Sequence, residues 1–183
     1  MRFLWRMPDD YPEALIGEYQ KETAPDRFDL QKGKSLGNEW GVPEFEFQAT
    51  SEELSKFDDL ANNAMVPLVS SRVAAFLNQS SGELVELIPA SIKTQDGNLE
   101  GYSVVNVRHF GESVDREKSQ YTCIPGTEQP MSFSKLEFRE NPDSRMIVRE
   151  KIYPGFIVVT DAFKQVCDEQ SWNGVGLFQA EDV

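Results

Sequence analysis

A period of two residues between large apolar side chains marks the start of the chain. Phe3, Trp5 and Met7 alternate with residues that include Arg2 and Arg6, and this alternation predicts a β-strand over residues 2–7. Residues 8–47 show no sustained period and contain four prolines and four glycines. Because proline and glycine interrupt regular structure, we expect short elements joined by turns there.

The pattern changes to a helical one at Thr50. Thr50 and Glu53 have the spacing of a capping box, and Leu54, Phe57 and Ala61 recur on one face. This pattern predicts a helix over residues 51–63. Its outer face would carry four acidic residues, namely Glu52, Glu53, Asp58 and Asp59.

The chain also contains an internal repeat at an offset of 90 residues. The aligned pairs include Val69 with Val159, Ser70 with Thr160, Val73 with Phe163, Leu77 with Cys167 and Leu87 with Leu177. Each copy is an apolar strand, a Ser or Thr placed to cap a helix, an amphipathic helix, a nearby glycine and a second apolar strand. We therefore predict two similar strand-helix-strand units, at about residues 66–90 and 156–180.

Further strands are expected between the two units. Apolar runs separated by turn residues lie at residues 102–110, 121–124, 133–138 and 146–148. The predicted fold is therefore α+β, with a mixed, largely antiparallel sheet on which the two units pack. The length of 183 residues fits one domain, residues 1–183, in which residues 1–65 are the less regular part.

The charge is strongly acidic. The chain has 18 Lys and Arg against 31 Asp and Glu, a net charge of −13, which disfavours nucleic acids and anionic membranes and favours a basic protein partner. Residues 39–59 carry seven acids against Lys56 alone: Glu39, Glu44, Glu46, Glu52, Glu53, Asp58 and Asp59. Neither a membrane span nor a secretory signal is visible, so we expect a cytoplasmic protein.

The residue types that carry most catalytic chemistry are scarce. Cys123 and Cys167 are 44 positions apart and His109 is the single histidine, so we expect no metal site and two free, mostly buried thiols. His109 lies inside the strand predicted at residues 102–110, where a structural role is commoner than a catalytic one. Because no nucleophile, phosphate-loop or dinucleotide motif occurs, we predict no catalytic residue and no cofactor. Paired carboxylates remain open, since spacing along the chain does not report distance.

A charged cluster follows the strand at residues 102–110. It consists of Asp115, Arg116, Glu117, Lys118 and Ser119. One interpretation is a turn in which Asp115 caps the residues after it and the charges face water. The other is a partner-contact loop held by a rigid sheet.

Several segments resemble one family of bacterial proteins. They are YSVVNV followed by VDREKS, PLVSSRVAAFL with ELVELIPASI, FIVVTDAFKQVCDEQSWNGVGLF, and less specifically RFDLQKGKSLG. The chain is similar over residues 25–180, and most over residues 66–178, to the eleventh family of polymorphic-toxin immunity proteins, first catalogued as a domain of unknown function. The matching positions include Ser70, Asp115, Lys118, Ser119 and Thr160, which the resemblance implies are mainly architectural.

The resemblance implies a function in competition between bacteria. Members of that family are implied to bind a cognate toxin, delivered by contact or secretion, and to neutralise it stoichiometrically without catalysis. We expect the toxin to act on a cytosolic target. Candidate partner-binding residues are Glu44, Glu46, Glu52, Asp58, Asp59, Asp115, Arg116 and Lys118. The alternatives are a carboxylate-based acid-base enzyme on a small molecule or glycan, and an accessory protein that binds an effector without neutralising it.

Overall fold

The computed structural model describes residues 1–180, and two three-stranded units form its frame. The first unit contains β4 (Leu68–Ser70), α2 (Ser71–Ser81), β5 (Val85–Pro89) and β8 (Tyr102–Val107). The second contains β13 (Ile157–Thr160), α3 (Asp161–Glu169), β14 (Gly176–Phe178) and β1 (Arg2–Arg6). The two predicted strand-helix-strand units and the predicted first strand are therefore confirmed.

In each unit a third strand lies antiparallel between the two strands of the repeat. Val105 of β8 faces Leu87, and Trp5 of β1 faces the aligned residue Leu177. On the other side of each central strand, Val69 and Val159 occupy matching positions. The strands β8 and β1 are thus structural equivalents, although β8 follows its unit in the sequence and β1 precedes its own.

The fold is α+β, as predicted, and eight of its ten strand pairings are antiparallel. The described residues form four sheets rather than one. The second unit extends through β12 (Ile147–Glu150) and β9 (Phe110–Gly111). A four-stranded sheet contains β2 (Glu18–Tyr19), β3 (Glu44–Glu46), β6 (Ser91–Thr94) and β7 (Gly97–Leu99). A two-stranded hairpin contains β10 (Gln120–Cys123) and β11 (Pro130–Lys135).

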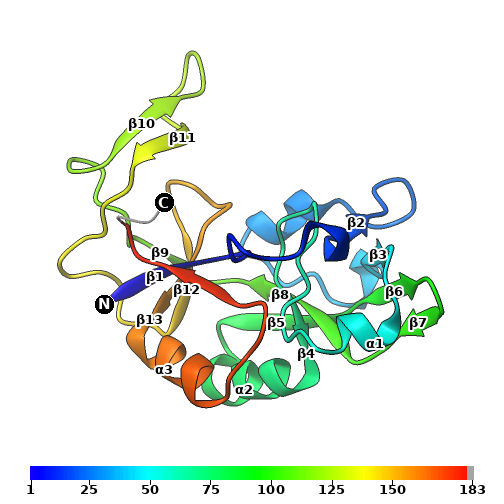
Figure 1. The fold of residues 1–183 in the computed structure, drawn as a ribbon. Coiled ribbons are helices and arrows are strands. Elements are labelled where there is room, and N and C mark those ends of the chain that lie inside the picture. The colour runs from blue at the N-terminus through cyan, green and yellow to red at the C-terminus, as the bar shows by residue number, and fades with distance from the viewer. Residues whose placement is uncertain (181–183) are drawn as a thin grey trace.

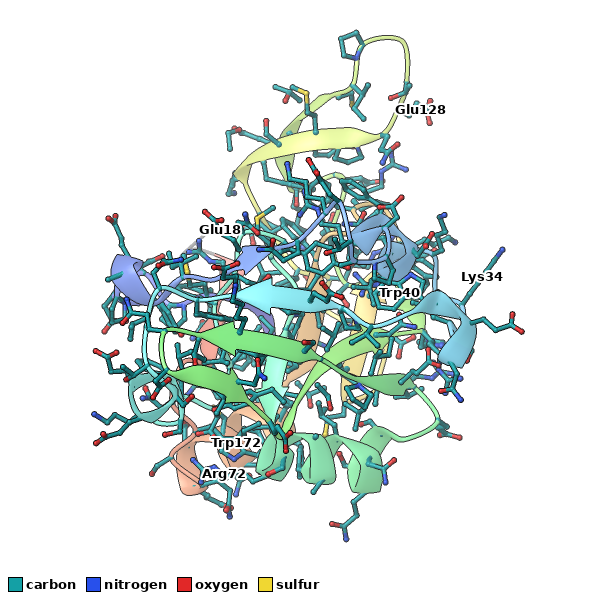
Figure 2. The ribbon with its side chains drawn as sticks, turned by 90° about the vertical axis from the view of Figure 1, so that its right-hand side faces the viewer. Glu18, Lys34, Trp40, Arg72, Glu128 and Trp172 are labelled. Atoms are coloured by element: carbon teal, nitrogen blue, oxygen red, sulfur yellow. The ribbon has the colours of Figure 1, made fainter. Side chains whose placement is uncertain are left out.

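Figures 1 and 2 show how these parts are arranged. The helices α2 and α3 lie side by side along one edge of the body, and the β10–β11 hairpin projects from the opposite edge (Figure 1). Glu128, at the end of this hairpin, lies well away from Trp172 and Arg72 near the two helices (Figure 2). Within residues 1–180 there is no helix with the length and apolar character that crossing a membrane requires.

Two hydrophobic cores lie on either side of β8. Val105 and Val107 point into a core shared with α2, α3 and β1, whereas Tyr102 and Val104 point into a second core. Because side chains alternate along a strand, a strand between two cores is apolar on both faces. The second core includes Phe45 and other residues before position 65, so the N-terminal part covers the second face of the β8 sheet.

The N-terminal part consists of short elements, as predicted. Besides β2 and β3 it has three single-turn helices, η1 (Glu13–Leu15), η2 (Arg27–Gln31) and η3 (Asn38–Trp40). They are joined by turns at which glycines such as Gly37 have a positive φ of 60°. That left-handed conformation suits glycine, which has no Cβ.

The helix predicted over residues 51–63 is wrong in length. The capping box at Thr50 and Glu53 is present, but α1 spans only Ser51–Leu54. After it, the N–H groups of Asp58 and Asp59 donate to the Asn173 carbonyl, and Leu60 N–H donates to the Leu68 carbonyl. These backbone donors are used in contacts with distant segments, and the helix therefore stops after one turn.

A methionine-rimmed cleft as candidate functional site

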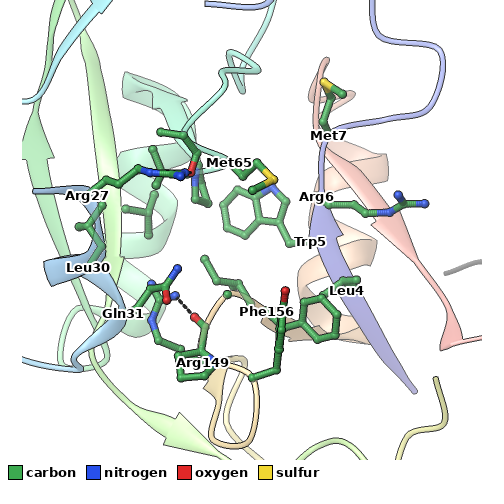
Figure 3. A pocket seen from close by; sticks show the side chains of 18 of the residues that line it. Leu4, Trp5, Arg6, Met7, Arg27, Leu30, Gln31, Met65, Arg149 and Phe156 are labelled. Carbon is green, nitrogen blue, oxygen red and sulfur yellow. Dashed lines mark hydrogen bonds between the residues drawn. The ribbon is translucent and has the colours of Figure 1, made fainter. Parts of the chain in front are cut away.

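A cleft of about 590 Å³ lies where β1, η2 and the turn at residues 153–156 meet, beside the turn that joins β10 to β11. Its walls are mainly apolar and include Trp5, Leu30 and Phe156. Figure 3 shows these side chains around the hollow, with Met65 and Arg27 near its edge. A concave, largely apolar hollow of this size with few polar groups is the usual form of a binding site.

The rim of the cleft collects most of the exposed apolar side chains. Seven large hydrophobic residues are exposed among residues 1–180, and five of them line this cleft. These five are Met7, Phe28, Met65, Ile124 and Met131. Single exposed apolar residues are ordinary, but a cluster around one hollow marks an interaction surface. Methionine suits such a surface because its flexible thioether adapts to a partner.

Met65 is unfavourable for folding in two ways. Its side chain is 81% exposed, and its backbone has a positive φ of 54°. It lies in a tight turn in which its N–H donates to the Asn62 carbonyl at 3.0 Å. Side chains with a Cβ are strained in the left-handed region, and asparagine tolerates it best among them. Neither feature stabilises the fold, which is consistent with a role in contact.

Met65→Asn should therefore raise the free energy of unfolding, by about 0.5 to 1 kcal/mol. The measurement is urea denaturation of the full chain. Met131→Asn is the matched control, because Met131 is also exposed on the rim but is not among the non-glycine residues of positive φ. Equal effects of both substitutions would show that backbone strain at Met65 is not the cause.

Two arginines line the cleft without a carboxylate partner. Arg149 is only 4% exposed, and its Nε donates to the Val107 carbonyl at 3.1 Å while its Nη1 donates to the Pro154 carbonyl. Burial lowers the pKa of Arg149 to about 10. Arg27 donates to the Ala64 carbonyl at 2.8 Å and stacks over the Phe28 ring. No ion pair involves either arginine within residues 1–180.

Asp59 is the buried carboxylate of the cleft. It accepts hydrogen bonds from Trp5 Nε1 at 2.8 Å and from Leu68 N–H at 3.0 Å. Burial raises the pKa of Asp59 to about 7, although both hydrogen bonds lower it. A carboxyl group in this range can exchange a proton near neutral pH.

Its neighbour Asp58 binds other segments. Asp58 accepts hydrogen bonds from Arg72 Nε at 2.6 Å, Ser70 Oγ at 2.8 Å and Asn173 N–H at 2.9 Å. Burial raises the pKa of Asp58, but these hydrogen bonds outweigh it and leave the pKa below its usual value. Asp58 and Asp59 are both buried, so the prediction that they lie on an exposed helix face is wrong. The helix ends before them, and their side chains bind distant parts of the chain.

Asp59→Asn tests the buried carboxylate. Because the folded-state pKa is above that of the unfolded chain, the folded state binds the proton more tightly between about pH 4 and pH 7. The stability from this group is therefore present at low pH and lost as pH rises through the folded-state pKa. Asparagine replaces one acceptor with a donor and should cost about 1 to 3 kcal/mol at pH 5. The difference in the free energy of unfolding between this variant and the wild type should be smaller at pH 8 than at pH 5.

The measurement is urea denaturation of both proteins at pH 5 and pH 8. Glu52→Gln, at an exposed residue of α1, is the control and should change stability by less than about 0.5 kcal/mol at either pH. A difference between wild type and Asp59→Asn that stays constant from pH 5 to pH 8 would contradict the raised pKa.

The other predicted acidic contact residues lie away from the cleft. Glu44 is half-buried and accepts a hydrogen bond from Thr23 Oγ1 at 2.8 Å. Glu46 lies 3.8 Å from Lys93 Nζ, and Glu52 is exposed on α1. None of the three lines the cleft. They remain candidates only for long-range attraction.

The charged cluster at residues 115–119 forms a turn at the base of the hairpin. Asp115 Oδ1 accepts hydrogen bonds from the N–H groups of Glu117 and Lys118, each at 3.1 Å. Glu137 N–H donates to Ser119 Oγ at 3.0 Å, and Asp115 N–H donates to the Glu137 carbonyl. The predicted turn is therefore present. Arg116 and Lys118 are exposed, so a contact role for them stays a prediction.

The predicted cap residues are in place but do not cap with their side chains. Ser70 and Thr160 are the N-cap residues of α2 and α3, and neither side chain bonds to the helix backbone. Ser70 Oγ instead donates to Asp58, and Thr160 Oγ1 is buried without a hydrogen-bond partner in the described part of the chain. The two residues share a position in the fold, because each ends a strand and directly precedes a helix.

His109 and the two cysteines are dispersed. His109 Nε2 lies 3.3 Å from Asp143 Oδ2, which also pairs with Arg145. Both cysteines are free, as predicted, and burial raises the pKa of Cys167 to about 11. Cys123 is exposed, contrary to prediction, because its strand lies in the projecting hairpin. Residues 1–180 contain no cluster of three or more His, Cys, Asp or Glu suited to a metal ion.

The chain matches no protein-family model and no curated protein sequence.

Sequence reasoning missed the cleft residues Phe28, Met65, Met131 and Arg149. Arg149 directly follows the apolar residues 146–148 in MIVREKI, and an arginine that continues an apolar strand was a usable signal for an unusual buried charge. The exposed methionines gave no signal, because sequence alone does not separate an exposed methionine from a core one.

Proposed function

We propose that this protein binds another protein through the cleft and its rim, and that it is an immunity protein which neutralises a cognate bacterial toxin by stoichiometric binding. The observation that carries the proposal is the gathering of five exposed hydrophobic side chains around one cleft. Large apolar residues at the centre of an interface supply much of its binding energy. The resemblance of the strand-helix-strand segments to immunity proteins supplies the class of partner.

A protein partner accounts for the rim better than a small ligand does. A small molecule inside the hollow would leave side chains such as Met65 and Met131, which are mostly exposed, in contact with water. A protein surface would cover both the hollow and the rim. A specific interface of about 1,600 Å² in total is enough for this, of which the cleft would be the centre.

The net charge of −13 supports a basic toxin. Long-range attraction speeds the encounter of oppositely charged proteins and weakens as salt screens it. The proposal places the protein in the cytoplasm, where the toxin would act on its target.

Reversing the charge of Glu44, Glu46 and Glu52 together should lower the association rate about tenfold at low salt. The dissociation rate should change little, because these residues lie outside the cleft. The measurement is stopped-flow or biosensor kinetics with the purified toxin over a range of ionic strength. An unchanged association rate and salt slope would remove these three residues from the steering surface.

Co-expression with the product of the adjacent gene tests the main proposal. Rescue of growth, together with a one-to-one complex on purification, is the expected result. A complex without rescue would instead support the accessory protein that binds an effector without neutralising it. If growth is not rescued and no complex forms, that gene product is not the toxin. The same assay with toxin domains from related bacteria would then be decisive.

One observation favours the acid-base enzyme as a second candidate. Asp59 is buried beside the cleft, and burial raises its pKa to about 7. The other carboxylate in the lining belongs to Asp9, and its Oδ1 lies 3.3 Å from Nη2 of Arg6. Turnover of a small molecule or glycan that is lost in Asp59→Asn but retained in Glu52→Gln would establish this activity in place of stoichiometric binding.

A further inference from the structure

Arg149 is a buried cation that has no counter-ion among residues 1–180. A guanidinium has five N–H donors, and Arg149 uses two of them on the carbonyls of Val107 and Pro154. The other three have no acceptor within the described part of the chain. Removing a charge from water without a paired charge is costly, and a fold normally avoids it.

The location of Arg149 indicates what this buried charge could bind. Arg149 lines the cleft, and Figure 3 shows Arg27, Gln31 and Arg149 coming from one side while Trp5 comes from the other. Arg27, another arginine of the lining, also lacks a carboxylate partner among the described residues. The cleft therefore combines three arginines, Arg6, Arg27 and Arg149, with the carboxyl groups of Asp9 and Asp59 and with apolar walls, in a protein of net charge −13.

We propose that the cleft binds a partner segment in which an aspartate or glutamate is flanked by large apolar side chains. The carboxylate would bind the guanidinium of Arg149, with Arg27 nearby, and the apolar side chains would contact Trp5, Phe156 and the rim methionines. Arginine binds carboxylates well because its planar donors match the two oxygens. This inference rests on the proposed function and specifies the part of the toxin surface that is recognised.

The acidic character of the whole protein does not conflict with this site. The acids Glu44, Glu46 and Glu52, of which the first two are half-buried and the third is exposed, lie outside the cleft. These acids attract a partner of opposite net charge at long range. Arg149 is buried and would instead bind a single carboxylate group in direct contact. A basic toxin with one acidic, apolar segment fits both features.

A phage-displayed random heptapeptide library, selected on the full chain, tests this specificity without knowledge of the toxin. The expected result is enrichment of peptides with an acidic residue between aromatic or aliphatic residues. Changing that acidic residue to its amide in the best peptide should weaken binding at least tenfold, as measured by fluorescence anisotropy. Enrichment without an acidic residue, or no enrichment, would overturn the proposal.

The variant Arg149→Met tests whether the preference for the acidic peptide depends on Arg149. In this variant, the acidic peptide and its amide twin should bind within about twofold of each other. Arg108→Met is the matched control, because Arg108 also donates to backbone carbonyls, those of Gly82 and Glu83, but does not line the cleft. It should keep the wild-type preference. An acid preference that survives in folded Arg149→Met would contradict the assignment.

A charge-preserving variant covers the case in which Arg149→Met does not fold. Arg149→Lys keeps a cation beside the Pro154 carbonyl and should retain part of the preference, at least threefold, whereas Arg27→Met should reduce it. If both variants fold and both keep the wild-type preference for the acidic peptide unchanged, the assignment is overturned. Growth rescue separates the two proposals. A protein that rescues growth but shows no acid preference retains the proposed function and loses only this inference.

Discussion

Replacing Phe163 by alanine is expected to lower the free energy of unfolding by about 3 to 5 kcal/mol. Phe163 is fully buried in α3, and its ring centre lies 5.1 Å from that of Trp5 and 5.8 Å from that of Trp172. It also contacts Phe76 of α2, with ring centres 6.1 Å apart. One side chain thus joins α3, β1 and α2, so its removal leaves a cavity where both units meet.

Urea denaturation of the wild type and the variant measures this loss. The dependence of the free energy of unfolding on urea concentration should have the same slope in both proteins. Gln165→Ala is the control on the same helix, because Gln165 is exposed and its side chain hydrogen-bonds only to Glu169 among the described residues. It should change stability by less than about 0.5 kcal/mol. A loss below about 1 kcal/mol in Phe163→Ala would mean that the two units do not depend on this contact.

The second large effect is expected on partner binding. Met131→Asp should weaken binding of the proposed toxin partner about 100-fold, or near 2.7 kcal/mol, because it places a charge in the apolar rim. Met131 is 53% exposed, so the free protein should keep its stability within about 0.5 kcal/mol. The measurement is calorimetric titration of the toxin into each variant.

Val42→Asp is the matched control for this prediction. Val42 is also a hydrophobic residue with 53% exposure, but it does not line the cleft. The toxin should bind this variant with wild-type affinity. Equal weakening by both substitutions, or none by Met131→Asp, would show that the cleft rim is not the interface.

Local patterns predicted much of the fold. The repeat at an offset of 90 residues corresponds to two units with matching register, and the aligned residues Val73 and Phe163 both enter the same core. The capping box at Thr50 is present as well. Such features depend on residues that are near one another in sequence, so their spacing is sufficient to find them.

Long-range contacts explain the failures. The periodicity of Leu54, Phe57 and Ala61 predicted a long helix, but hydrogen bonds to Asn173 and Leu68 end it early. The same segment buries Asp58 and Asp59, because Arg72 and Trp5 supply their hydrogen-bond donors. No pattern within residues 51–63 reports on these partners.

The sequence by itself determined the α+β class, the two repeated units and the acidic charge, because these follow from local period and composition. Only the tertiary structure decided where the proposed interaction surface lies. Pairing of β1 with β13 places Leu4 and Trp5 beside Val158 and Ile157, and the N-terminal part and the hairpin complete the cleft. The exposure of Met65 and the burial of Arg149 depend on this assembly of distant segments. Both are properties of solvent access, which is set when the chain packs.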